Sequence, residues 1–155
     1  MRIAVAGDTH GRTESIRKAL SHIRFDSLFF TGDYYRDGKK LASQIKVKYY
    51  GVVGNCDLSM GKTELMVKLD GCSFYITHGH RYGVKKSINS LFYRGKEMGA
   101  DAVIFGHTHV PFIERIDDMW LINPGSPSLP RSNSRCTYAV IETDNGSLKP
   151  RIIEL

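Results

Sequence analysis

Residues Ile3-Ala4-Val5-Ala6-Gly7-Asp8-Thr9-His10 form a short apolar run that meets a glycine, an acid and a histidine. The run is too short for the apolar core of a signal peptide, and it predicts a buried first strand. Thr13 follows and can cap a helix whose apolar residues recur at helical spacing from Ile16 to Ile23. The chain is therefore expected to begin as a strand and a helix, with polar side chains at the end of the strand.

The same alternation continues through the first half of the chain and then gives way to strands. We expect strands at 27–31 and 47–53 around a short helix at 39–45. Asp70-Gly71 predicts a hairpin turn between alternating residues 65–69 and a strand at 74–77. The remaining expected elements are a helix at 88–98 and strands at 102–105, 112–116, 120–122, 138–143 and 149–153. Mixed βαβ units followed by antiparallel strands predict an α/β fold with two sheets packed face to face and helices outside.

The composition fits one domain spanning 1–155 that carries a basic surface. The chain has 22 Lys+Arg against 16 Asp+Glu, a formal net charge of +6, which suits an anionic partner such as nucleic acid, a membrane surface or a phosphorylated small molecule. Its apolar runs fall short of the roughly 20 residues that span a bilayer, so no membrane association is expected. The three cysteines are scattered, at Cys56, Cys72 and Cys136, which indicates a reducing, cytoplasmic setting.

The histidines gather in three short clusters at expected strand ends. These clusters are Asp8-Thr9-His10, His78-Gly79-His80 and His107-Thr108-His109. Two further strand ends carry oxygen ligands, in Thr31-Gly32-Asp33 and Val53-Gly54-Asn55-Cys56-Asp57. Because the ends of neighbouring strands meet at one edge of a sheet, which is where α/β folds bind ligands, these side chains are expected to lie together.

Their chemistry indicates divalent metal binding. Neutral imidazoles combined with carboxylates and an amide oxygen suit Mn, Fe, Zn, Co or Ni. Seven candidate ligands exceed the coordination of one ion and suit two ions that share a bridging carboxylate. Paired ions clamp the attacking and leaving oxygens in phosphoryl hydrolysis. Each motif alone is weak evidence for a metal site, since an Asp after a strand is usually a cap or a turn residue. The prediction of a metal site rests on the ordered series of motifs.

Taken in order, with the later Asn123-Pro124-Gly125-Ser126 and Pro130-Arg131, these motifs resemble the calcineurin-like metallophosphoesterase superfamily and its small prokaryotic phosphodiesterase branch. The resemblance implies a four-layer α/β/β/α sandwich with two mixed β-sheets and a dinuclear site at one edge. It also implies two divalent ions, with manganese favoured and nickel, iron, cobalt or zinc as alternatives. A bridging hydroxide would attack phosphorus in line. The implied ligands are Asp8, His10 and His109 for the first ion, Asn55, His78 and His107 for the second, and Asp33 as the bridge.

One position departs from the family pattern. Many family phosphatases carry a histidine after the Asn of the third motif, and here that residue is Cys56, which puts efficient monoester hydrolysis in doubt. His80 is the candidate catalytic proton donor instead, with a phosphate-binding or structural role as the alternative. Arg12, Asn55 and Arg131 are the candidates for substrate binding, although Arg12 also fits a solvated residue before a helix.

The leading hypothesis is a phosphodiesterase that acts on a small phosphorylated substrate. A nuclease and a monoester phosphatase would share the same metal chemistry, so nucleic acid is compatible with the sequence but not required. A third alternative is a non-catalytic scaffold like the retromer subunit of this superfamily, whose metal site is degraded. Such a scaffold is expected to lose ligands, whereas this chain keeps all seven. Oligomerisation is compatible with the sequence and is not indicated by it.

Overall fold

Alternate residues of the first strand, β1 (Arg2–Ala6), face opposite layers of the molecule. In the computed structural model, which describes residues 1–58 and 61–155, Ile3 and Val5 pack between two sheets, whereas Ala4 and Ala6 pack against helices. The two-residue period of a strand produces this division, because successive side chains point to opposite faces. Both faces of β1 are apolar, and the strand is accordingly central in its sheet.

Two five-stranded sheets, both mixed, face each other. The first has the order β10-β9-β1-β2-β3, in which β1, β2 and β3 are parallel and β9 is antiparallel to both β1 and β10. Its other strands are β2 (Ser27–Phe30), β3 (Lys48–Gly51), β9 (Thr137–Asp144) and β10 (Ser147–Glu154). The second has the order β4-β5-β6-β8-β7, in which β5, β6 and β8 are parallel and the edge strands β4 and β7 are antiparallel. Its strands are β4 (Glu64–Leu69), β5 (Cys72–Thr77), β6 (Ala102–Ile104), β7 (Pro111–Ile116) and β8 (Met119–Pro124).

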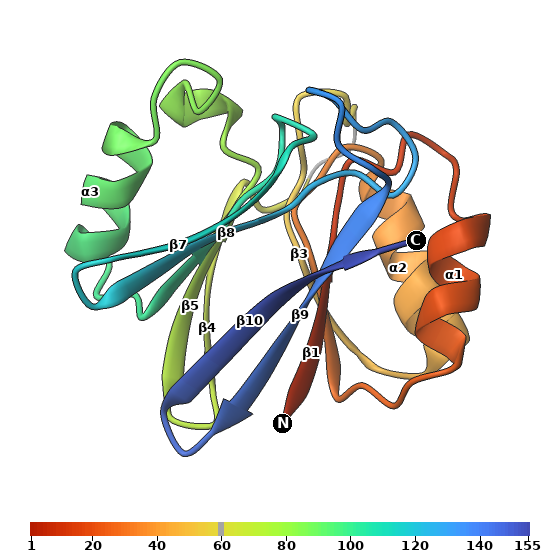
Figure 1. Ribbon diagram of the computed structural model, residues 1–155, viewed down its shortest axis with the longest axis horizontal. Helices are drawn as coiled ribbons and strands as arrows, with labels where there is room; N and C mark the ends of the chain where they lie inside the picture. The colour runs from red at the N-terminus through yellow and green to blue at the C-terminus, as the bar shows by residue number, and fades with distance from the viewer. Residues whose placement is uncertain (59–60) are drawn as a thin grey trace.

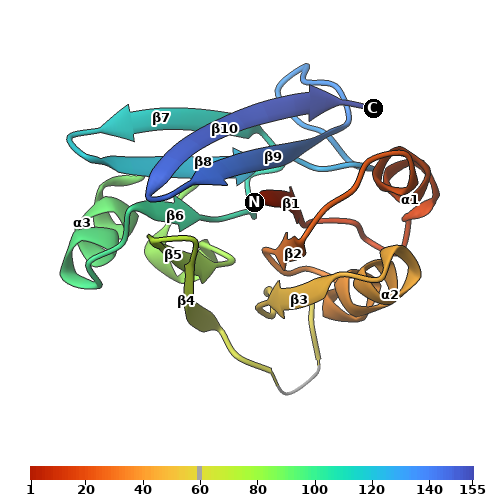
Figure 2. The same cartoon turned by 90° about the horizontal axis from the view of Figure 1, so that it is seen from below.

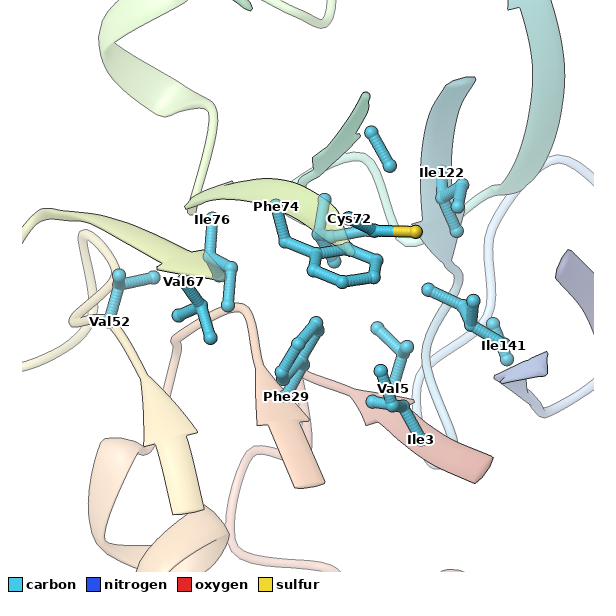
Figure 3. Close-up of a cluster of buried hydrophobic side chains, with 13 residues drawn as sticks. Ile3, Val5, Phe29, Val52, Val67, Cys72, Phe74, Ile76, Ile122 and Ile141 are labelled. Atoms are coloured by element: carbon cyan, nitrogen blue, oxygen red, sulfur yellow. The ribbon is translucent and has the colours of Figure 1, made fainter. Parts of the chain in front are cut away.

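The space between the sheets is filled by an apolar core (Figure 3). The ring of Phe29 from β2 meets the ring of Phe74 from β5 edge-on, with centroids 5.1 Å apart. Ile3 and Val5 of β1 lie on the same side of this core as Phe29, and Ile76 lies on the side of Phe74. Because interiors are close-packed, this contact holds the two sheets at a fixed separation.

Helices cover the two outer faces (Figures 1 and 2). The helices α1 (Glu14–Ser21) and α2 (Tyr35–Ile45) pack Ile16 and Leu41 onto the first sheet. The helix α3 (Asn89–Glu97) packs Leu91 onto the second sheet. The predicted α/β/β/α sandwich is therefore confirmed.

Three expected boundaries need correction, and one short element was not expected. The helix α1 ends at Ser21, so Ile23 lies beyond it and is 40% exposed. The helix α2 begins at Tyr35 rather than at residue 39, and β3 ends at Gly51. A short 3₁₀ helix, η1 (His80–Tyr82), follows β5 and was not expected.

A distant side chain explains the early start of α2. Tyr34 before it has a left-handed backbone (φ 68°) and makes no side-chain cap. The Tyr35 backbone N–H instead donates to Asp57 Oδ1 at 2.7 Å, and the Gly54 N–H donates to Asp57 Oδ2 at 2.8 Å. One carboxylate thus satisfies a free N–H at the helix start and also fixes the loop after β3.

No helix in the two described stretches is long and apolar enough to cross a membrane.

Candidate metal centre

The candidate site is built from loops that follow strands of both sheets. Asp8 and His10 follow β1, Asp33 follows β2, Asn55 follows β3, His78 follows β5, and His107 and His109 follow β6. Five of these seven residues have positive φ: Asp8 (51°), His10 (47°), Asp33 (51°), His107 (69°) and His109 (60°). Non-glycine residues rarely adopt this conformation, and it persists only where surrounding contacts impose it, commonly at functional sites.

A first group of side chains converges beside the loop after β1. Ligand atoms of Asp8, His10, Asp33 and His109 all lie within 4.8 Å of one another. His109 Nε2 lies 3.2 Å from His10 Nε2 and 3.5 Å from Asp8 Oδ1. The other nitrogen of His109, Nδ1, lies 2.7 Å from the Leu129 carbonyl and donates its proton to it. The Nε2 lone pair of His109 therefore points at the other acceptors of the group.

A second group lies on the other side of Asp33. His78 Nδ1 lies 2.8 Å from the Thr31 carbonyl and donates to it, which leaves the lone pair on Nε2. That Nε2 lies 3.0 Å from Asn55 Oδ1 and 3.2 Å from His107 Nδ1. This group thus contains one amide oxygen and two imidazole nitrogens, with Asn55 Oδ1 and His107 Nδ1 each within 3.2 Å of His78 Nε2.

Asp33 stands between the two groups. Its Oδ2 lies 3.8 Å from His10 Nε2, and its Oδ1 lies 3.4 Å from His78 Nε2. The Cys56 backbone N–H donates to the same Oδ1 at 2.8 Å and holds the carboxylate in this orientation. The two oxygens of one carboxylate therefore face two different sets of acceptors.

Burial sets the charge state of these groups. Burial and the neighbouring His78 lower the pKa of His107 to about 4, and burial lowers the pKa values of His78 and His109. All three imidazoles are therefore neutral near pH 7, the form that binds metals. Burial raises the pKa of Asp33, but His78 and the Cys56 N–H outweigh it, so the net pKa lies below the usual value and the group is ionised.

The arrangement fits divalent cations. The side chain of Asp8 is fully buried, and its Oδ1 has no hydrogen-bond partner among the described residues. Burial, and then Asp33, raise the pKa of Asp8 well above its usual value. An unpaired buried carboxylate that faces imidazole lone pairs is costly unless a cation compensates it. Nitrogen and oxygen donors of this kind suit borderline and hard divalent ions.

Glycines make room for both carboxylates. A Cβ at Gly54 would collide with Asp33 Oδ1, and a Cβ at Gly106 would lie 2.7 Å from Asp8 Oδ2. The glycine of Val53-Gly54-Asn55 and the glycine before His107 thus serve close packing around the site rather than chain flexibility.

Known proteins match this chain over nearly its whole length. A family model described as the calcineurin-like phosphoesterase superfamily domain matches residues 1–146. This chain belongs to the calcineurin-like phosphoesterase superfamily. A Bacillus subtilis relative, the probable metallophosphoesterase YsnB, is 31% identical, and the match covers 99% of this chain and 91% of YsnB. The Escherichia coli K12 phosphodiesterase YfcE is 25% identical, over 93% of this chain and 89% of YfcE.

Solved structures agree with the fold of this superfamily member. A Streptococcus pneumoniae protein described as a predicted phosphoesterase superposes with a TM-score of 0.85 at 27% identity, over 99% of this chain and 88% of that chain. Vps29 from Entamoeba histolytica, in a structure described as a complex with Zn²⁺, superposes with a TM-score of 0.81. It is 19% identical over 99% of this chain and 98% of Vps29, so this likeness shows the fold alone.

A second layer of polar residues in this phosphoesterase fold orients the candidate ligands. Asn123 donates from Nδ2 to the Gly106 carbonyl at 2.9 Å and to Thr108 Oγ1 at 3.0 Å. Ser126 Oγ donates to the Asp8 carbonyl at 2.8 Å. Through these hydrogen bonds, residues 123–126 connect the loop after β6 to the loop after β1. The acceptors Thr31 and Leu129 were missed, because a backbone carbonyl leaves no mark in the sequence.

The remaining candidates of the phosphoesterase site lie around its edge. The ring of His80 lies 5.2 Å from that of His78 and 6.0 Å from that of His107, centroid to centroid. Arg12 is exposed beside a hollow at the start of α1, and Arg131 is exposed beside a hollow next to His109. Lys85 was missed as a site residue; it lines the same hollow as Arg131, and its charge lowers the pKa of Asp8 against the larger effect of burial.

Proposed function

We propose that this protein is a divalent-metal-dependent phosphodiesterase with a dinuclear site. The observation that carries the proposal is the position of Asp33, whose two oxygens face two separate sets of nitrogen and oxygen acceptors. One of those sets contains the unpaired buried oxygen of Asp8. A single carboxylate so placed suits a bridge, since its charge offsets the repulsion between two dications.

The seven candidate ligands divide between two ions. Asp8, His10 and His109 would hold the first, and Asn55, His78 and His107 would hold the second, with Asp33 shared. When bound, such ions lower the pKa of water and neutralise charge on phosphoryl oxygens. Manganese remains the favoured ion, with nickel, iron, cobalt and zinc as alternatives.

Side chains of the protein supply positive charge around the site and a proton for the leaving oxygen. Lys85 and Arg131 present cationic side chains beside the site, where they attract an anionic substrate. Burial and the neighbouring Asp33 raise the pKa of Cys56 to about 11, far from the working pH of a general acid. Burial lowers the pKa of His80 from its usual value. This lowered pKa favours the neutral ring near pH 7, so the assignment rests on position: we assign the proton for the leaving oxygen to His80 because its ring lies 5.2 Å from that of His78 and 6.0 Å from that of His107, with Arg12, Asn55 and Arg131 as substrate-binding groups.

The preference for diesters rests on Cys56 and on one relative. Cys56 occupies the position where many family phosphatases carry a histidine, and YfcE is named a phosphodiesterase. Bis(4-nitrophenyl) phosphate and 4-nitrophenyl phosphate release the same leaving group, so a comparison of their kcat/KM values isolates the preference. A higher value for the monoester would replace the proposal with a monoester phosphatase.

The central test combines metal analysis with Asp33→Ala. We expect the manganese-loaded protein to hold two ions per chain and the variant to lose at least one, with activity reduced at least roughly 10²-fold. Asp101→Ala is the matched control, because Asp101 also accepts a backbone N–H, from Ser73 at 2.7 Å, at the start of β5 and away from the site. Activity that survives in Asp33→Ala would refute the dinuclear mechanism.

Two alternatives have their own discriminating measurements. A non-catalytic interaction scaffold would share this fold, as Vps29 does, and it predicts that the manganese-loaded chain hydrolyses neither phosphate ester; metal binding alone does not discriminate, because a Vps29 structure is itself described as a complex with Zn²⁺. The net charge of +6 suits a nuclease, which predicts an affinity for single-stranded DNA that falls steeply with salt. A small-substrate phosphodiesterase shows a much weaker dependence of KM on salt.

A further inference from the structure

A hollow of about 350 Å³ lies next to the candidate metal centre. That volume falls within the range of sites that bind small molecules, roughly 300–1,000 Å³. The hollow is lined by Val84, Lys85, Ile88, Phe105, Thr108, Val110, Phe112, Arg131 and Ser132. None of these residues belongs to the seven candidate ligands.

Apolar side chains form most of the lining. Val84 and Phe105 are buried, at 6% and 2% exposure, and both line the hollow. The ring of Phe112 meets that of Phe105 edge-on with centroids 6.2 Å apart, while Ile88 and Val110 are half-buried. An apolar group that enters the hollow would therefore remove both its own surface and this lining from water.

The hollow and the metal centre share one loop. Phe105 directly precedes the Gly106-His107 turn, and Thr108 lies between His107 and His109, so the lining continues into the candidate ligands. Lys85 and Arg131 stand on the same lining and are both exposed. Their charges reach the site: both oppose the rise that burial causes in the pKa of Asp8. An anion at the metal centre is thus flanked on this side by two cations and an apolar surface.

We propose that this hollow binds an apolar ester substituent, aryl or alkyl, of an anionic phosphodiester whose phosphorus lies at the metal centre. The proposal rests on the proposed function and adds the substrate class. Phe105, Phe112, Val110 and Ile88 contact the substituent. Lys85 and Arg131 contact the phosphate oxygens on the side that faces away from the ions.

The neighbouring hollow at α1 lacks this apolar character. It is lined by Gly11, Arg12, Thr13, Glu14, Ser15, Pro127, Ser128 and Cys136, most of which carry polar groups or no side chain. A polar or charged part of a substrate fits that side, and an apolar part fits the side of Phe112. The site would therefore prefer diesters with an apolar substituent over small polar diesters.

Two symmetric anions that cannot be hydrolysed test this preference. Diphenylphosphinate and dimethylphosphinate carry the same charge and differ in apolar surface, and calorimetry gives their Kd values on the manganese-loaded protein. We expect diphenylphosphinate to bind at least roughly tenfold more tightly, because burial of part of one ring suffices for that factor. Because both substituents are the same in each probe, the result does not depend on which ester group leaves.

A matched pair of variants locates the effect. Ile88→Ser makes the hollow more polar and places a favoured N-cap residue before α3, so we expect the variant to fold, which its Tm checks. We expect it to reduce the ratio of the two Kd values at least threefold. Ile23→Ser makes the same change at an exposed position outside this hollow and leaves the ratio unchanged.

The outcomes separate the two proposals. Equal Kd values, or a ratio that Ile88→Ser does not change, would overturn the assignment of the hollow even if bis(4-nitrophenyl) phosphate is hydrolysed. A clear preference that disappears in Ile88→Ser supports the assignment. The same preference without hydrolysis of any diester would overturn the proposed function and leave the apolar anion-binding hollow in place.

Discussion

At the scale of one residue, the buried side chain of Asp8 is suited to metal binding and not to the stability of the metal-free fold. Its side chain is fully buried, and Oδ2 accepts the His107 backbone N–H at 2.9 Å. Its Oδ1 has no hydrogen-bond partner among residues 1–58 and 61–155, and His109 Nε2 approaches it to 3.5 Å. Without a cation, this oxygen carries a desolvation cost that the fold does not compensate.

Asp8→Asn should therefore separate stability from metal binding. The amide keeps an oxygen for the His107 N–H and offers an N–H toward the His109 lone pair, so we expect the metal-free variant to be more stable by about 1–3 kcal/mol. Urea unfolding in the presence of a chelator measures this difference. The same variant should bind manganese at least tenfold more weakly. A metal-free variant less stable than the wild type would contradict this account of Asp8.

The pKa of His107 predicts how the stability of the metal-free protein changes as the pH falls. Its pKa of about 4 in the folded chain lies below the value of about 6.5 expected when unfolded. The unfolded chain therefore binds more protons between these values, and the stability contributed above pH 6.5 is lost as the pH falls toward 4. We expect the urea midpoint in chelator to fall from pH 7 to pH 5, and to fall less in His107→Gln. An equal fall in both proteins would contradict this role for His107.

The sequence predicted which side chains come together better than it predicted the groups that orient those side chains. Each candidate ligand has a distinctive side chain in a short motif after a strand, so their convergence could be expected because strand ends meet at one edge of a sheet. The carbonyls of Thr31 and Leu129, which orient His78 and His109, could not be found this way because every residue carries a carbonyl. Lys85 was missed because its place beside the site depends on the path of the loop after η1.

At the scale of the element, α2 supports the loop that carries His10. Asp37 of α2 accepts a hydrogen bond from Thr9 Oγ1 at 2.7 Å and another from the Gly11 backbone N–H at 3.0 Å. These two bonds bracket His10, whose φ of 47° is unfavourable for a residue with a side chain. A helix on the outer face of the sheet thus holds a candidate ligand in a strained conformation.

Asp37→Ala should weaken the first metal position more than the fold. We expect a loss of about 1–2 kcal/mol in unfolding free energy, and weaker binding of one ion of the pair, because the His10 loop is released. Asp26→Ala is the control, since Asp26 also accepts a backbone N–H, from Arg2 at 2.6 Å, before β2 and at the opposite end of the sheet. Metal titrations that show the same affinities for both variants would exclude a positioning role for α2.

The errors in the predicted boundaries of helices and strands have a similar cause. Buried strands were placed within a few residues because their apolar runs end at glycines or polar residues. The start of α2 was placed too late, because the group that accepts the Tyr35 N–H is Asp57, 22 residues away in sequence. No local capping motif marks that start, and Lys39 is only where the apolar spacing becomes regular.

At the scale of the whole molecule, the candidate ligands come from both sheets. Asp8, His10, Asp33 and Asn55 follow strands of the first sheet, whereas His78, His107 and His109 follow strands of the second. The two sheets are otherwise joined at this end by polar contacts such as Ser126 to the Asp8 carbonyl. Ions held by both sets would therefore cross-link the two halves of the sandwich.

Removal of metal should consequently destabilise the entire fold and not only the loops. A ligand present at about 1,000 times its Kd stabilises the folded state by roughly 4 kcal/mol, and a chain of this size shifts its Tm by about 2–4 °C per kcal/mol. We expect a chelator to lower the Tm of the manganese-loaded wild type by roughly 8–16 °C. Asp33→Ala should show less than half of that shift, because the carboxylate shared by both ions is missing, whereas Asp101→Ala should show all of it. A wild-type Tm that does not respond to the chelator would mean that the ions, if bound, do not connect the sheets.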